Sequence, residues 1–119
     1  RAIRDIADRA RTKKLSPDEV HGGTFTITNP GPFGSILSVP IINEGQAGIL
    51  ATDAVTKRPV VVTDEYGDDS IAIRHMVFLS MSWDHRVVDG AEAAQFLAHL
   101  KSLLEDADFD SDLSPYLPE

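Results

Sequence analysis

The sequence predicts an α+β fold in which helices flank a mixed or antiparallel sheet. Three observations carry this prediction. Apolar residues recur at helical spacing over 90–106, and they alternate with polar residues over 24–29 and 77–84. Turn-forming residues at 64–69 separate two runs rich in β-branched side chains, which is typical of a hairpin.

The N-terminal part predicts two helices. The first places apolar residues on one helical face, at Ile3, Ile6, Ala7 and Ala10. We expect it to end within 12–15. Ser16, a following proline and Glu19 three residues after the serine form a capping box, which predicts a second, short helix.

The middle of the chain predicts strands joined by loops. The alternation over 24–29 indicates a half-buried strand, and the two prolines and two glycines of 29–34 indicate a loop. Residues 36–43 predict an edge or irregular extended segment because they contain a proline. The apolar run 46–55 predicts a more buried strand.

The second half predicts a hairpin, a strand and a long helix. We expect 60–63 to pair with 71–74 across the turn, and 77–84 to form a strand with one large apolar face. That strand ends just before His85. The helix over 90–106 has the clearest pattern in the chain.

Length and composition predict one domain. With 119 residues, of which 42% are hydrophobic, the chain can bury one modest core. We expect this domain to occupy 1–106 and to be followed by an acidic tail at 107–119. Because Arg1 already lies within a helical pattern, we expect the chain to be a piece of a longer protein.

The charge and residue usage argue against several classes of partner. With 19 acidic and 11 basic residues, the net charge of −8 would repel nucleic acid and an anionic membrane surface. The absence of cysteine excludes a disulfide framework, a thiolate nucleophile and a thiolate metal site. No apolar run approaches the roughly 20 residues that span a bilayer. We therefore expect a cytoplasmic protein without nucleic-acid or membrane partners.

The segment 82–90 brings together the residues best suited to chemistry. His85 is a candidate general base, because imidazole exchanges protons near neutral pH. The alternative is a histidine that is simply solvated or hydrogen-bonded. Asp84 and Arg86 can be an ordinary surface pair worth about 0 to 1 kcal/mol. A metal site at Asp84, His85 and Asp89 is a weak pattern, and we expect no metal.

Asp89 and Thr28 each have a structural explanation. Asp89 begins a capping box with Glu92 and therefore explains the start of the long helix. Thr28 lies on the polar face of its strand, just before the proline-glycine loop. A threonine in such a place needs no function, so neither residue identifies a site when it is considered alone.

Together, however, these segments resemble the catalytic domain of the dihydrolipoamide acyltransferases, the core-forming component of 2-oxo acid dehydrogenase complexes. Residues 84–90 match the family signature Asp-His-Arg-x-x-Asp-Gly, whose shorter form, His-x-x-x-Asp-Gly, is shared with chloramphenicol acetyltransferase-like enzymes. Residues 22–29 resemble the family strand Gly-Gly-Thr-Phe-Thr-Ile-Ser/Thr-Asn, and 40–43 and 48–50 follow in the expected order. The resemblance covers 1–106, the C-terminal half of such a domain.

The resemblance implies a chloramphenicol acetyltransferase-like fold, here as a partial domain, and acyl transfer between dihydrolipoamide and coenzyme A. His85 would be the general base that takes the thiol proton, and Thr28 would donate a hydrogen bond to the oxyanion. Asp89 would order the histidine loop. Coenzyme A would be the co-substrate, and the lipoyl group would be carried on a domain absent from this chain.

The resemblance also implies partners. Family members form homotrimers in which the histidine of one subunit faces the hydroxyl of its neighbour, and many assemble into larger cores. A lipoyl domain and the decarboxylase and dihydrolipoamide dehydrogenase components complete the complex. Residues 31–35 look somewhat like the succinyl-transferring branch, but acetyl, succinyl and branched acyl groups stay open. Trp83 stands where the family more often has tyrosine or phenylalanine, a change expected to affect packing.

Two other functions remain as alternatives. One is a non-catalytic core or scaffold fragment of such a complex, in which the motif serves folding. The other is a related acyltransferase that acts on a small alcohol or amine. A lipoyl domain encoded upstream would argue against the second alternative. The activity of the isolated C-terminal half also stays open.

Overall fold

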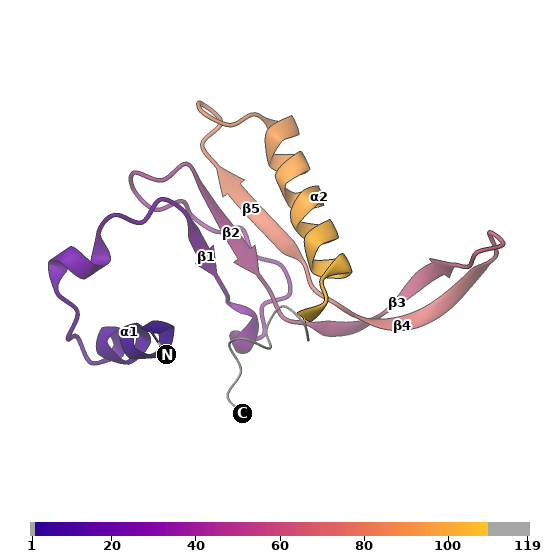
Figure 1. Cartoon of the computed structure of the whole chain (residues 1–119), viewed down its shortest axis with the longest axis horizontal. Helices are drawn as coiled ribbons and strands as arrows, with labels where there is room; N and C mark the ends of the chain where they lie inside the picture. The colour runs from indigo at the N-terminus through magenta and orange to yellow at the C-terminus, as the bar shows by residue number, and fades with distance from the viewer. Residues whose placement is uncertain (1, 110–119) are drawn as a thin grey trace.

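The computed structural model describes residues 2–109, and it has the predicted α+β composition. Its elements follow in the order α1 (Ala2–Arg11), η1 (Pro17–Val20), β1 (Thr26–Thr28), η2 (Gly31–Phe33), β2 (Gly48–Thr52), β3 (Thr56–Thr63), β4 (Asp69–Met76), β5 (Leu79–Trp83) and α2 (Gly90–Asp106), shown in Figure 1. Among the described residues, no helix is long and apolar enough to cross a membrane. The predicted acidic tail lies outside the described residues from 110 onward.

The central sheet is mixed and has the strand order β1-β2-β5. Strand β1 runs parallel to β2, with Thr28 opposite Ala51, while β5 runs antiparallel, with Ser80 opposite Ala51. The middle strand β2 is the most buried part of the chain, because it has a neighbour on each side and cover on both faces. Its Ala51 is fully buried.

Helix α2 covers one face of this sheet (Figure 1). Phe25 leaves the β1 ladder and packs its ring against Phe96 of α2, with 6.0 Å between ring centroids. The strand β1 is shorter than the predicted 24–29, since its ladder with β2 covers only Thr26–Thr28. On the same face, a Cβ added at Gly48 would lie 2.9 Å from Cε of Met81, so a larger residue there would displace the end of this methionine side chain.

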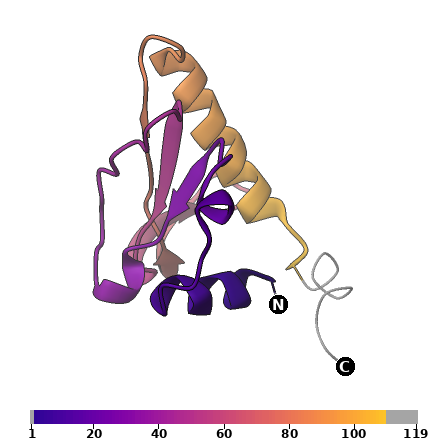
Figure 2. The ribbon, with the colours of Figure 1, turned by 90° about the vertical axis from the view of Figure 1, so that its left-hand side faces the viewer.

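The connection between η2 and β2 covers the opposite face, as the edge-on view in Figure 2 shows. Ser80 on β5 donates from Oγ to the carbonyl oxygen of Ser38 at 2.6 Å. Thr26 on β1 donates to Oε1 of Gln46 at 2.7 Å. The segment 36–43, predicted to be an edge or irregular extended segment, forms no helix or strand. Hydrogen bonds of the connection that contains it attach it to the sheet.

The β3–β4 hairpin extends away from the sheet as a separate two-stranded ribbon (Figure 1). Both strands are longer than predicted. On one face Val61 lies opposite Ile71, and these side chains are 68% and 80% exposed. Ile73 on the same face is 69% exposed. A ribbon of two strands is marginally stable alone, so this apolar face is a surface suited to contact with further polypeptide.

The N-terminal elements lie beside the sheet rather than on it (Figures 1 and 2). The predicted capping box is present: the backbone N of Ser16 donates to Oε2 of Glu19 at 2.9 Å. The helix it begins is a 3₁₀ turn, η1. Arg9 of α1 pairs with Glu19 at 2.6 Å, which links the two elements. Of the two α-helices, α2 is the one that packs on the sheet.

Candidate active site

The turn between β5 and α2 is built around Asp84. Its backbone N donates to the carbonyl oxygen of Ala47 at 2.9 Å, which ties the start of the turn to β2. The carbonyl oxygen of Asp84 then accepts from the backbone N of Val87 and of Val88, both at 3.1 Å. The chain therefore reverses tightly at the end of β5 and carries His85 on the outside of the turn.

Asp84 and Arg86 bond to each other on either side of His85. Nε of Arg86 lies 2.9 and 3.0 Å from the two carboxylate oxygens, and Nη2 lies 2.6 Å from Oδ2. The backbone N of Arg86 also donates to Oδ1 at 2.9 Å. The side-chain bond from Arg86, followed by its backbone bond, lowers the pKa of Asp84 to about 2. This pair fixes the backbone on both sides of the histidine.

The titration of Asp84 tests this contact. We expect its carboxyl to titrate near pH 2 in the folded protein, and Arg86→Gln to raise that midpoint towards the ordinary value of about 3.9. Because the folded pKa is the lower one, the contact stabilises the turn above about pH 4 and is lost as the pH falls towards 2. Carbon-detected NMR of the carboxyl measures the midpoint. Lys101→Gln, which breaks the exposed pair with Glu105, is the control and should leave it unchanged.

His85 itself is exposed, and its ring lies over Trp83 with 6.1 Å between centroids. Within residues 2–109, no hydrogen bond engages either ring nitrogen. Whichever nitrogen carries no proton in the neutral imidazole is therefore free to accept one from a substrate, as a general base requires. The indole Nε1 of Trp83 is buried and has no hydrogen-bond partner. It is the one buried side-chain nitrogen or oxygen of which this is true among the described residues.

Asp89 is the N-cap of α2, as predicted. Its Oδ1 accepts from the backbone N of Glu92 at 2.8 Å, and its own backbone N donates to Oε2 of Glu92 at 3.1 Å. The carboxylate thus fixes the C-terminal end of the histidine turn to the helix. The geometry agrees with an ordering role, since proton transfer would require a contact with the imidazole.

Thr28 ends β1 on the sheet face opposite α2 and is half-buried. Within residues 2–109 its hydroxyl has no hydrogen-bond partner. Thr26, two residues earlier on the same face, differs: its Oγ1 donates to Gln46 and accepts from Nδ2 of Asn43 at 2.8 Å. Of these two threonines, Thr28 is therefore the one with a hydroxyl available to a ligand.

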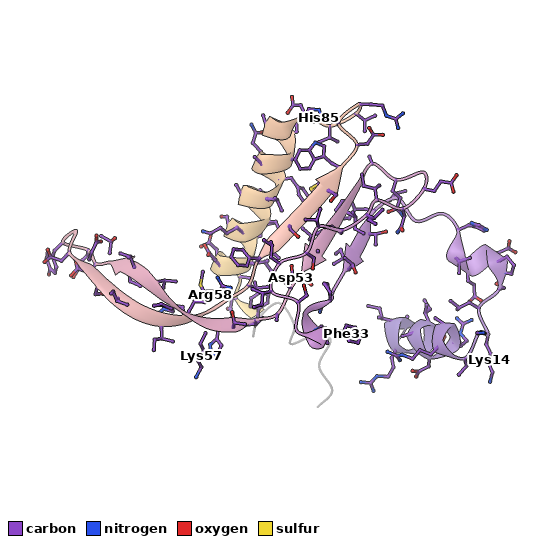
Figure 3. The ribbon with its side chains drawn as sticks, turned by 180° about the vertical axis from the view of Figure 1, so that it is seen from behind. Lys14, Phe33, Asp53, Lys57, Arg58 and His85 are labelled. Carbon is purple, nitrogen blue, oxygen red and sulfur yellow. The ribbon has the colours of Figure 1, made fainter. Side chains whose placement is uncertain are left out.

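One chain does not bring Thr28 and His85 together. Thr28 is paired through Ala51 with Ser80, whereas His85 follows the end of β5, which runs the opposite way. Strand spacings put Trp83, the last residue of β5, about 10 Å from Thr28 along the strands and about 10 Å across them, and His85 lies in the turn beyond it. Figure 3 shows His85 at one end of the sheet and Phe33 of η2 at the other.

Asp53 follows the last residue of β2 and is buried, although no sequence motif pointed to it. Its side chain is 4% exposed and accepts hydrogen bonds from Ser35 and Ser38. The signal in the sequence is a single carboxylate inside the apolar run 46–55. A buried carboxylate is costly unless it is bonded, which makes such a residue a candidate for a specific role.

The family model described as 2-oxoacid dehydrogenases acyltransferase (catalytic domain) matches residues 1–109. The chain belongs to this family, and the predicted membership is confirmed.

One curated relative and two solved structures support the same family membership. The dihydrolipoyllysine-residue acetyltransferase component of the pyruvate dehydrogenase complex of Corynebacterium glutamicum is 56% identical over 113 residues, 95% of this chain and 17% of that protein. Dihydrolipoamide acetyltransferase of Azotobacter vinelandii, studied for the role of a serine, a histidine and an asparagine in its catalytic mechanism, is 38% identical with a TM-score of 0.79 over 94% of this chain and 43% of its own.

The second structure is the cubic core of a pyruvate dehydrogenase multienzyme complex, 38% identical with a TM-score of 0.76 over 92% of this chain and 42% of its own. These neighbours confirm the predicted fold class. This chain thus spans less than half of each matched catalytic structure, and a sixth of the curated relative.

Proposed function

We propose that the protein containing this chain transfers an acyl group between dihydrolipoamide and coenzyme A within a 2-oxo acid dehydrogenase complex. The observation that carries the proposal is His85, an exposed imidazole with both nitrogens unbonded, on a turn held by Asp84, Arg86 and Asp89. Family membership supplies the class of reaction. The relatives include both acetyltransferase and succinyltransferase components, so the acyl group stays open between these two.

In this reaction a nitrogen of His85 takes the proton of the coenzyme A thiol, and the thiolate sulfur attacks the carbonyl carbon of the acyl thioester. Thr28 donates a hydrogen bond to the resulting oxyanion. The carbon–sulfur bond to dihydrolipoamide then breaks, and the departing sulfur takes the proton from the histidine. The thiol proton moves to the imidazole as the sulfur attacks, which is the step that a positioned general base assists.

The site requires two copies of the chain. Because His85 and Thr28 lie at opposite ends of the sheet, the hydroxyl that meets a given histidine belongs to a neighbouring subunit in this proposal. A homotrimer, as family resemblance implies, makes three such sites. The cubic-core neighbour supports assembly into a larger core. The catalytic set of the Azotobacter enzyme, a serine, a histidine and an asparagine, parallels Thr28, His85 and Asp89 by residue type.

Co-expression of two inactive variants of the complete protein tests this arrangement. We expect His85→Ala and Thr28→Ala to lack activity separately and to recover about a quarter of wild-type activity when co-assembled in equal amounts. The reason is that one interface in four then joins an intact histidine to an intact threonine. Acyl transfer from acyl-coenzyme A to free dihydrolipoamide is the measurement.

Two differently tagged His85→Ala copies provide the control for co-expression and should show no recovery. Activity that stays at background in the mixed assembly would place both residues in one chain and reject the shared site.

The remaining partners follow from the same proposal. A lipoyl domain delivers the acyl group, and the decarboxylase and dihydrolipoamide dehydrogenase components act before and after the transfer. The cytoplasmic location stays a prediction. Absence of acyl transfer by the complete wild-type protein would instead favour the non-catalytic scaffold.

A further inference from the structure

A polar cluster buried beneath the 35–46 connection is centred on Asp53. Its Oδ1 accepts from Oγ of Ser35 at 2.7 Å and from Oγ of Ser38 at 2.5 Å, and its Oδ2 accepts from the backbone N of Ser38 at 3.1 Å. Within residues 2–109, no cation forms an ion pair with it. A buried anion without a counter-charge is retained at a cost, which three convergent donors offset.

These bonds favour the ionised form. The hydrogen bond from the hydroxyl of Ser38, the largest influence, lowers the pKa of Asp53, and the bonds from Ser35 and from the backbone N of Ser38 act in the same direction. Burial opposes them. The carboxylate is therefore a charged acceptor that organises the donors around it.

The cluster also holds the chain that leaves β1. A Cβ added at Gly31 would lie 2.7 Å from the carbonyl carbon of Asp53 and 2.8 Å from the backbone N of Ala54, so the loop after Thr28 lies directly on this backbone. The backbone N of Ala54 donates to the carbonyl oxygen of Ser35 at 2.7 Å. The backbone at Gly31, three residues after Thr28, thus packs directly on the backbone that follows β2.

Asp53 lies near Thr28 on the same face of the sheet. Thr28 is opposite Ala51, and side chains two residues apart on a strand point to the same face. Strand spacings place the Cα atoms of Thr28 and Asp53 about 8 Å apart. Ser80, in the row of Thr28, bonds to the carbonyl oxygen of Ser38 at 2.6 Å and links the third strand to the cluster.

We propose that Asp53 is a positioning residue for Thr28, acting through Ser35, Ser38 and the Gly31 backbone to hold the end of β1 where the threonine hydroxyl meets the oxyanion. The inference rests on the proposed acyltransferase function. It follows from the contacts above, because the hydroxyl of Thr28 has no bond of its own within 2–109 and depends on the backbone for its position. Displacement of a reacting group by about 1 Å can cost on the order of 10²-fold in rate.

A double-mutant cycle in the complete protein tests the coupling. Asp53→Asn offers an amide nitrogen in place of one carboxylate oxygen, so it loses an acceptor while keeping the shape. We expect kcat to fall about tenfold with KM for both substrates unchanged. In the Thr28→Ala background, the same change should alter kcat less than about twofold, because the group it positions is already absent.

Controls separate positioning from stability. Asp69→Asn alters an exposed carboxylate that accepts from Oγ1 of Thr63 at 2.7 Å, and it should leave kcat unchanged. Ser35→Ala removes one donor and leaves the carboxylate, so it keeps the test available if Asp53→Asn fails to fold. We expect it to lower kcat about threefold in wild type and not in Thr28→Ala.

Two results would overturn the inference. One is an unchanged kcat in both Asp53→Asn and Ser35→Ala. The other is a double mutant with Thr28→Ala whose fold-loss of kcat equals the product of the two single losses. His85→Ala distinguishes this failure from failure of the proposed function. If His85→Ala abolishes turnover while the Asp53 cycle shows no coupling, the positioning role alone is rejected. If His85→Ala retains full turnover, the general-base role of His85 is rejected, and if the wild-type protein transfers no acyl group, the acyltransferase proposal is rejected and the positioning role with it.

Discussion

Replacement of His85 by alanine in the complete protein should lower kcat for acyl transfer between acyl-coenzyme A and dihydrolipoamide by 10²- to 10⁴-fold, the range typical of a lost general base. The thiol proton then loses its acceptor, because within residues 2–109 no other titratable side chain forms a hydrogen bond or ion pair with the imidazole and could take over its place. KM should change little, since the proton moves only as the reaction proceeds. Steady-state kinetics with free dihydrolipoamide measures both constants.

His99→Ala is the matched control, because His99 is also exposed but lies on α2 away from the turn. It should retain wild-type kcat. Rate loss in His85→Ala should also become smaller as the pH rises, because a larger fraction of the thiol is then already ionised. Equal kcat in the His85→Ala variant and wild type would rule out the general base.

Replacement of Thr28 by alanine should lower kcat by about 10²- to 10³-fold, with KM nearly unchanged. The oxyanion forms only during the reaction, so the lost hydrogen bond affects the transition state and not the bound substrate. The folded protein should lose little stability, because no described group bonds to this hydroxyl and none is left unpaired. Kinetics and thermal unfolding together separate the two effects.

Thr26→Ala is the contrasting variant. Its hydroxyl joins Gln46 to Asn43, so its removal should lower the melting temperature without a comparable fall in kcat. Thr28→Ser keeps the hydroxyl and should retain activity within about tenfold. A Thr28→Ala variant that loses affinity alone would argue against oxyanion stabilisation.

Elements governed by near neighbours in the chain could be predicted well. Helix α2 has the predicted bounds, because its apolar spacing and the Asp89–Glu92 capping box are contained within a few residues. The β3–β4 hairpin was predicted for the same reason, although the ladder extends further on each side than the β-branched runs. The predicted strand 24–29 was too long, since the residues that pair with β2 are only Thr26–Thr28 and pairing depends on a distant segment.

The sequence by itself determined the family, the α+β class, the histidine turn and the capped helix, because each depends on short-range pattern. The tertiary structure alone decided which hydroxyl is available, since the partners of Thr26 lie about twenty residues away. It likewise joined Asp53 to serines that are 15 and 18 residues distant, and it put Thr28 and His85 at opposite ends of one sheet. Strand direction and long-range pairing have no local signature, so the separation of Thr28 and His85 within one chain was decided by the tertiary structure, whereas a site shared between subunits was implied by the family resemblance.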